Sequence, residues 1–197
     1  MLDEKGVDYG VLSGIGLAIA AAVVLLFIFS VLRSSETADR TIALESDASE
    51  VCGDIETVGA MAVPYTAVHY YDMGGIDVYV SSGYVNASCG NETFSRPFAC
   101  RIVPGTYSVN GTLLWNGTAE MREYLCKSFN ATGTRDRPIP NGSTGALSEL
   151  MHRACMSTLA SPVEVPHGKP LIIEKTFIYA MDGARMEAEP YVLVYPG

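Results

Sequence analysis

The segment Val11–Leu32 reads VLSGIGLAIAAAVVLLFIFSVL and contains no charged residue. As a helix rising 1.5 Å per residue, this run would be about 33 Å long, against roughly 30 Å of hydrocarbon in a bilayer. A core helix of a soluble protein normally keeps a polar stripe, which this segment lacks. We therefore expect a hydrophobic helix over residues 11–33 that lies in membrane lipid or in a bundle of identical helices.

The first half of this helix is rich in small side chains. They are Gly14, Gly16, Ala18, Ala20, Ala21 and Ala22. Small residues permit close helix-to-helix approach in lipid or in a filament core. The pattern is equally compatible with a small-residue patch that is merely tolerated, and both interpretations stay open.

After Arg33 the sequence becomes charged, but its apolar residues remain ordered. Leu44, Ala48, Val51, Ile55, Val58 and Ala62 recur with a mean spacing of 3.6, which is the period of an amphipathic helix. We interpret Asp47, Glu50 and Asp54, on the other side, as a solvated face. Since Pro64 stops a helix, we expect a helical stalk over residues 34–63, whose second half packs on the protein's own sheet.

Beyond the stalk, short β-prone stretches separated by turn residues predict a β-rich head over residues 64–197. The predicted strands are 67–71, 76–85, 98–103 and 107–115, and the predicted helices are 119–129, capped by Thr118, and a second one capped by Thr144. The tail predicts a hairpin of residues 171–181 and 191–195 with a type I′ turn at Asp182-Gly183. The expected fold class is α+β: a polar leader at 1–10, a long N-terminal helix, and a head with two short helices.

Composition restricts the partners of this chain. Its formal net charge is −9 over 197 residues. A surplus of negative charge repels phosphate backbones and anionic lipid headgroups, so nucleic-acid binding and peripheral polybasic membrane binding are disfavoured. The length is sufficient for one ordinary domain and an anchor.

Asparagine usage is the strongest functional signal. All six asparagines, Asn86, Asn91, Asn110, Asn116, Asn130 and Asn141, begin an N-x-Ser/Thr sequon without an intervening proline. Serine and threonine together make up 29 of the 197 residues, so about one asparagine in seven would fit the pattern by chance. Asn-Gly-Thr and Asn-Gly-Ser are also ordinary turn sequences, but that accounts for only some members of the set. We expect N-linked glycans on an exposed, extracellular head.

The five cysteines agree with an oxidising location. They show no Cys-x-x-Cys motif and no metal-ligand spacing with histidine, so disulfides are the simpler interpretation. The expected pairs are Cys89 with Cys100 and Cys126 with Cys155. Cys52 is left over, either as a buried thiol or as a bond to another subunit.

The basic residues that flank the apolar run do not define its orientation. Lys5 precedes the run, while Arg33 and Arg40 follow it. This count gives no support for an external C-terminus by the positive-inside rule. The sequons and cysteines nevertheless place the head outside.

Taken together, a short leader, a Lys5-Gly6 step, an aliphatic helix, a helical continuation and a β-rich head with sequons resemble the plan of archaeal type IV pilin-like proteins. The resemblance covers the whole chain. It implies leader cleavage between Gly6 and Val7 and assembly of identical subunits into a surface filament. Val11, rather than glutamate, would stand at the fifth mature position. An uncleaved, membrane-anchored ectodomain similar to the stator subunits of archaeal swimming filaments therefore stays open.

The sequence contains no enzyme signature. A Gly-x-Ser-x-Gly elbow, a phosphate loop, a dinucleotide fingerprint and a His-Glu-x-x-His motif are all missing. His69, His152 and His167 are far apart in the chain and are interpreted as surface or structural residues. We expect no catalytic, cofactor-binding or metal site.

Overall fold

In a computed structural model, the fold is described for residues 4–197 and the side chains for residues 14–197. The helices are α1 (Glu4–Ala60), α2 (Gly117–Phe129), a 3₁₀ turn η1 (Asn141–Ser143) and α3 (Thr144–Ala160). The strands are β1 (Tyr65–His69), β2 (Asp77–Ser81), β3 (Tyr84–Cys89), β4 (Glu92–Pro97), β5 (Ile102–Pro104), β6 (Thr106–Val109), β7 (Thr112–Asn116), β8 (Val163–Glu164), β9 (Leu171–Asp182) and β10 (Arg185–Pro196). The predicted α+β class, with a long N-terminal helix and two shorter helices in a β-rich head, is confirmed.

The chain divides into two compact units, one ending at Ala43 and the other comprising Leu44–Gly197. In the first unit, the threonines after the apolar run fit into the helix by bonding to its backbone. The Thr37 hydroxyl donates to the carbonyl of Arg33, and the Thr41 hydroxyl donates to that of Thr37, each at 3.0 Å. Such bonds satisfy the hydroxyls within the helix, and helix α1 is continuous through this polar stretch.

The second unit, called the head here, includes the last turns of α1. Its apolar stripe is fully buried: Leu44, Ala48, Val51, Ile55 and Val58 have at most 1% of their surface exposed. The predicted packing of the second half of the stalk is therefore confirmed. The helix ends at Ala60, earlier than predicted, and Ala62 is exposed.

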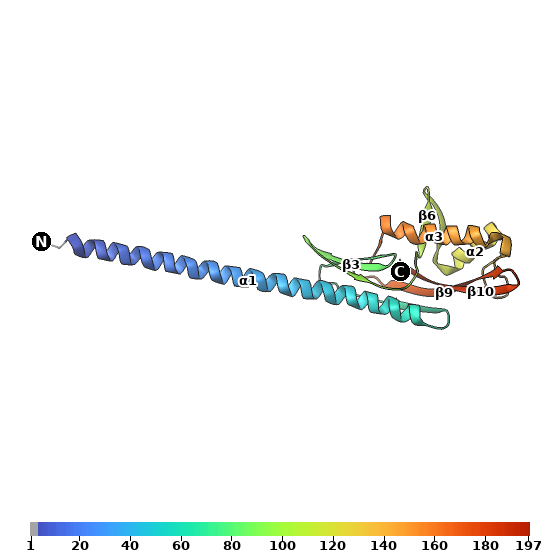
Figure 1. The fold of residues 1–197 in the computed structure, drawn as a ribbon, viewed down its shortest axis with the longest axis horizontal. Helices are drawn as coiled ribbons and strands as arrows, with labels where there is room; N and C mark the ends of the chain where they lie inside the picture. Colours follow the sequence, from blue (N-terminus) through green and yellow to red (C-terminus); the bar gives the residue numbers. More distant parts are fainter. Residues whose placement is uncertain (1–3) are drawn as a thin grey trace. The chain divides into compact units, whose positions relative to one another are not determined.

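Two four-stranded sheets and one hairpin form the β structure of the head. One sheet has the order β1-β9-β10-β5, and the other has the order β4-β3-β2-β8, while β6 pairs with β7. All pairs are antiparallel except β10 with β5. Figure 1 shows the head's part of α1 on one side of β9 and β10, with α2 and α3 on the other.

Neighbouring residues in β9 illustrate this layering, because successive side chains in a strand point to opposite faces. The Lys175 ammonium donates to the carbonyl of Gly59 in α1 at 2.5 Å. Thr176, on the opposite face, accepts a hydrogen bond of 2.8 Å from Arg122 in α2. A core cluster lies on the α2 and α3 side of the sheet. Its buried members include Trp115, Met121, Leu125, Ile139, Met151, Ile178 and Leu193.

Several strand predictions were wrong because glycine turns interrupt them. The predicted strand 76–85 is divided into β2 and β3 by a turn at Gly83, whose φ is +99°. The predicted strand 107–115 is divided at Asn110 and Gly111, whose φ values are +51° and +77°. Positive φ at both central residues is the type I′ geometry of a two-residue hairpin.

The C-terminal hairpin was predicted correctly, but its turn was not. Asp182 pairs with Arg185, so Gly183 and Ala184 are the two loop residues. Gly183 has a φ of +61°, and Ala184 is not among the residues with positive φ. This combination is typical of a type II′ turn rather than the predicted type I′ turn at Asp182-Gly183.

The remaining differences between prediction and structure concern one missed strand and the ends of other elements. Strand β4, with the sequence ETFSRP, was missed because it lies at a sheet edge and is largely exposed. The predicted strand 98–103 is shortened to β5, and the predicted strand 67–71 is shifted to β1. Helix α2 begins one residue before Thr118, and α3 begins at Thr144; their N-cap residues, Asn116 and Ser143, make no side-chain cap bond.

Candidate functional site

The apolar surface of α1 is the first candidate site. Every large apolar side chain from Ile15 to Leu32 has 46–75% of its surface exposed. The described part of α1, Gly14–Ala60, is long and apolar enough to cross a membrane by length and composition. Burial of this surface in lipid or protein would be favourable at about 25 cal/mol per Å². This surface can therefore bind lipid or an apolar protein surface.

The predicted processing site lies near the start of the same helix. Gly6 and Val7 have helical backbone within α1. Their side chains, and residues 1–3 of the predicted leader, lie outside the described residues. Cleavage between Gly6 and Val7 stays a prediction.

The six sequons are distributed over turns, helix ends and one strand of the head. Asn91 and Asn110 lie in hairpin loops, Asn116 and Asn130 flank α2, and Asn141 begins η1. All five are exposed. Asn86 is half-buried in the middle of β3, where its amide oxygen accepts a 3.1 Å hydrogen bond from the Ser95 hydroxyl. The structure thus brings the sequons onto the surface of one unit without gathering them into one cluster.

The predicted disulfides are not formed. All five cysteines, which lie within the residues with described side chains, are free thiols. Cys89 pairs with Glu92 at one end of the β3–β4 hairpin, while Cys100 follows the other end. The five steps of β4 separate these ends by about 17 Å, far beyond the roughly 7 Å Cα separation that a disulfide allows. The pairing of Cys89 with Cys100 was therefore wrong.

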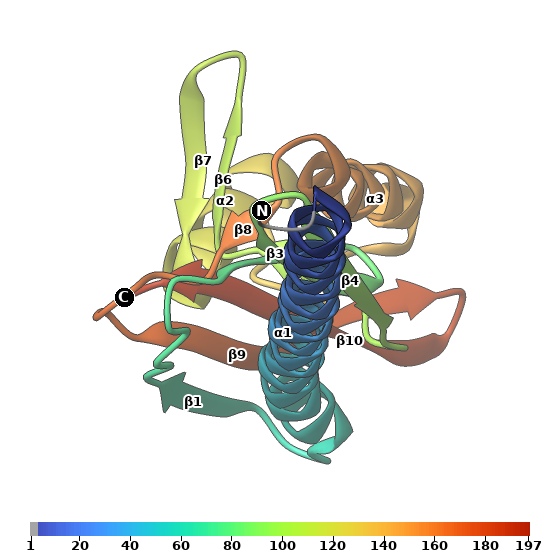
Figure 2. The ribbon, with the colours of Figure 1, turned by 90° about the vertical axis from the view of Figure 1, so that its left-hand side faces the viewer.

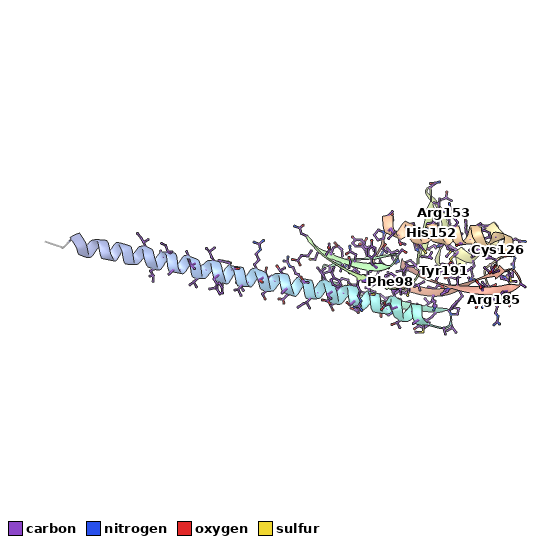
Figure 3. All side chains as sticks on the ribbon, viewed as in Figure 1. Phe98, Cys126, His152, Arg153, Arg185 and Tyr191 are labelled. Atoms are coloured by element: carbon purple, nitrogen blue, oxygen red, sulfur yellow. The ribbon has the colours of Figure 1, made fainter. Side chains whose placement is uncertain are left out.

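The two cysteines of the second predicted disulfide, Cys126 and Cys155, have different surroundings. The sulfur of Cys126, in α2, accepts a long contact of 3.9 Å from Arg137. Cys155, in α3, instead lines a cavity of about 380 Å³ together with Cys100 and His152. Figure 3 shows Cys126 and His152, one turn from Cys155, apart along the head. The structure therefore gives no support for the bond between Cys126 and Cys155.

Burial disfavours the thiolate form of three of these cysteines. Desolvation raises the pKa of Cys52, Cys100 and Cys155 above the ordinary thiol value. A raised pKa keeps the thiol protonated, and the thiolate is the reactive form. Cys52 is buried in the α1 stripe, which agrees with the buried-thiol interpretation of this residue.

Asp54 was wrongly assigned to a solvated face. Its carboxylate accepts a 2.7 Å hydrogen bond from the Tyr71 hydroxyl and lies 3.1 Å from Nδ1 of His69. Burial, together with the Asp54 charge, raises the pKa of Tyr71. This network connects α1 to β1 and to the segment after it. The sequence carried no signal for it, because its members are distant in the chain.

A second polar network lies where α2 begins. The Glu174 carboxylate accepts hydrogen bonds from the Tyr195 hydroxyl at 3.2 Å and from the backbone N–H of Thr118 at 3.4 Å. Gly105 is required beside it, because a Cβ at this position would lie 1.9 Å from the Tyr195 ring. Burial, and then the charge of Glu174, raises the pKa of Tyr195 to about 12.

The raised pKa of Tyr195 predicts a loss of stability at alkaline pH. An unfolded tyrosine ionises near pH 10. The folded head favours the neutral phenol, so its contribution is present below about pH 10 and is lost as the pH rises towards 12. We expect Tyr195→Phe to lower the free energy of unfolding at pH 7 by about 0.5–1.5 kcal/mol, with a smaller alkaline loss than wild type. Urea unfolding between pH 7 and pH 11 measures both effects; a steeper alkaline loss in the variant would contradict this assignment.

No metal site emerges from the described residues. Among them, no group of three or more histidine, cysteine, aspartate or glutamate side chains is arranged to hold an ion. In comparisons with known proteins, no family model matches the chain, and no curated protein and no solved structure gives a match.

Proposed function

We propose that this chain is a structural subunit of a type IV pilus-like filament on an archaeal cell surface. The N-terminal helices of identical subunits pack together, and the glycosylated heads face outward. The proposal is supported above all by the apolar surface of α1 between Ile15 and Leu32. Because this surface is exposed in the single chain, its burial requires lipid or other copies of the helix.

The head supports an outward position through its own composition. It buries its apolar residues independently of the exposed run, and five of its six sequon asparagines are exposed. A folded, sequon-bearing unit joined to an apolar helix is the arrangement that a surface subunit needs. The five cysteines, which are free thiols, do not support an external location of the head.

A second function is favoured by the residue at position 11. Val11 stands at the fifth position of the chain that cleavage after Gly6 would produce, where the pilin-like pattern has glutamate. Without cleavage, the helix would be a permanent single-pass anchor. The head would then act as an envelope-binding or stator-like accessory subunit.

N-terminal sequencing and negative-stain microscopy of native material distinguish these two functions. A subunit of a filament is expected to begin at Val7 and to sediment as filaments. An anchored accessory subunit is expected to begin at Met1 and to be extracted by detergent as monomers or small complexes. A freely soluble monomer without detergent would contradict both functions.

A charge in the middle of the apolar run is expected to disrupt either assembly. We expect Ala21→Arg to reduce recovery in the membrane or filament fraction by about tenfold or more, because a central arginine costs about 2.5–3.5 kcal/mol in insertion. The matched control is Thr37→Arg, an exposed position of the same helix beyond the run. Immunoblots of fractionated cells give the measurement, and equal recovery of the two variants would argue against an apolar environment for residues 11–32.

A further inference from the structure

The hairpin of β6 and β7 carries two sequons with the same three residues. Asn110-Gly111-Thr112 forms its turn, and Asn116-Gly117-Thr118 follows its second strand into α2. From the sequence alone the two tripeptides are equivalent acceptors for N-linked glycans. Their surroundings in the folded head are different.

The first tripeptide is open to solvent. Asn110, Gly111 and Thr112 are all exposed at the tip of the hairpin. Figure 2 shows this hairpin extending away from the other elements of the head. An enzyme could therefore contact both the Asn110 amide and the Thr112 hydroxyl in the folded protein.

The second tripeptide has all three of its backbone N–H groups engaged. That of Asn116 donates to Glu120 at 2.9 Å, and that of Gly117 donates to the carbonyl of Gly105 at 2.8 Å. The N–H of Thr118 donates to Glu174 at 3.4 Å. The Asn116 side chain is itself bonded, because its amide oxygen accepts a 2.7 Å hydrogen bond from Thr106.

The Thr118 hydroxyl is the decisive group. It is buried, and it has no hydrogen-bond partner among the described residues. The sequon requires a hydroxyl at its third position, so glycan transfer depends on access to this group. Although Thr118 as a whole is half-buried, it belongs to α2, whose Met121 and Leu125 side chains have no exposed surface, and packing of this helix keeps the hydroxyl covered.

We propose that folding of the head closes the Asn116 sequon to glycan transfer and leaves the Asn110 sequon open. In the transfer, the amide nitrogen attacks C1 of a lipid-linked glycosyl phosphate. The new N–C1 bond replaces the C1–O bond, the lipid phosphate leaves, and the amide proton passes to a base of the membrane transferase. A glycan reaches Asn116 only before α2 packs. This inference rests on the outward, glycan-bearing head of the proposed function.

The test uses the full chain, produced without glycans and folded in detergent. It is incubated with membranes that contain an oligosaccharyltransferase and a polyprenyl-linked glycosyl phosphate donor. Glycopeptide mass spectrometry then follows each sequon over time. We expect a rate at Asn116 about a hundredfold below that at Asn110, because two large buried side chains must be exposed before transfer.

A variant that frees α2 provides the second arm. Met121→Asp is expected to bring the rate at Asn116 to that at Asn110, while Glu123→Asp, at an exposed position of α2, leaves the difference unchanged. Equal rates in the folded wild-type chain would overturn the inference alone. So would a Met121→Asp chain that is modified at Asn110 but not at Asn116. Modification of neither sequon in any chain would overturn the inference together with the glycosylated head of the proposed function.

Discussion

Replacing Trp115 by alanine is expected to lower the free energy of unfolding of the head by about 3–5 kcal/mol. The Trp115 side chain has no exposed surface and lies in the cluster that α2 and α3 form on the sheet. Its ring centroid lies 4.7 Å from that of Tyr107 and 5.9 Å from that of Tyr124. Its indole N–H donates to the carbonyl of Pro104 at 3.0 Å. Truncation would leave a large cavity and an unpaired carbonyl.

Pulse proteolysis in urea measures this change, because the chain contains a single tryptophan and its fluorescence disappears with the substitution. Leu113→Ala is the matched control, since Leu113 lies in the same strand with 54% of its surface exposed. The control is expected to stay within about 0.5 kcal/mol of wild type. A Trp115→Ala head as stable as the control would show that this cluster does not hold the hairpin to the helices.

Replacing Lys175 by methionine is expected to lower the free energy of unfolding by about 2–4 kcal/mol. Lys175 is 6% exposed, and its ammonium donates to the carbonyls of Gly59 and Met61 at the end of α1. The last turn of α1 contains no basic residue of its own. A cation from β9 therefore compensates the negative end of the helix dipole and satisfies carbonyls without helical partners.

Lys169→Met is the control for this prediction, because it removes the same charge at an exposed position. Urea unfolding measures the change in stability. Hydrogen exchange of the last turn of α1 shows whether the loss comes from the uncapped helix end or from the head as a whole. We expect faster exchange near Val58 in Lys175→Met and no change in the control. Unchanged stability and exchange in both variants would mean that water satisfies the two carbonyls equally well.

The sequence predicted those elements whose signal lies within one continuous stretch. The uncharged run Val11–Leu32 and the helical spacing of the apolar residues from Leu44 to Val58 were sufficient for the long helix and its buried stripe. The composition of the C-terminal segment was likewise sufficient to predict the hairpin of β9 and β10. These predictions succeeded because hydrophobic periodicity is local and reports directly which face of an element is buried.

Turns and edges were harder for a physical reason. Asn110-Gly111 is a turn pair that favours positive φ, but the β-prone residues on both sides led to one continuous predicted strand. Gly83 likewise interrupts a stretch whose side chains favour β structure. Strand β4 is stabilised by pairing with β3 rather than by its own apolar residues. The pairing of Cys89 with Cys100 failed similarly, because spacing along the chain contains no information about distance across a hairpin.

By itself, the sequence determined that one apolar helix precedes a β-rich unit bearing six sequons. Only the tertiary structure decided that Lys175 caps a helix ending 115 residues earlier in the chain, at Ala60, and that Asp54 is held by Tyr71 and His69. It also decided that two identical Asn-Gly-Thr tripeptides differ in access to their hydroxyls. Composition and periodicity are properties of neighbouring residues, whereas burial and hydrogen-bond partners depend on which distant segments the fold brings together.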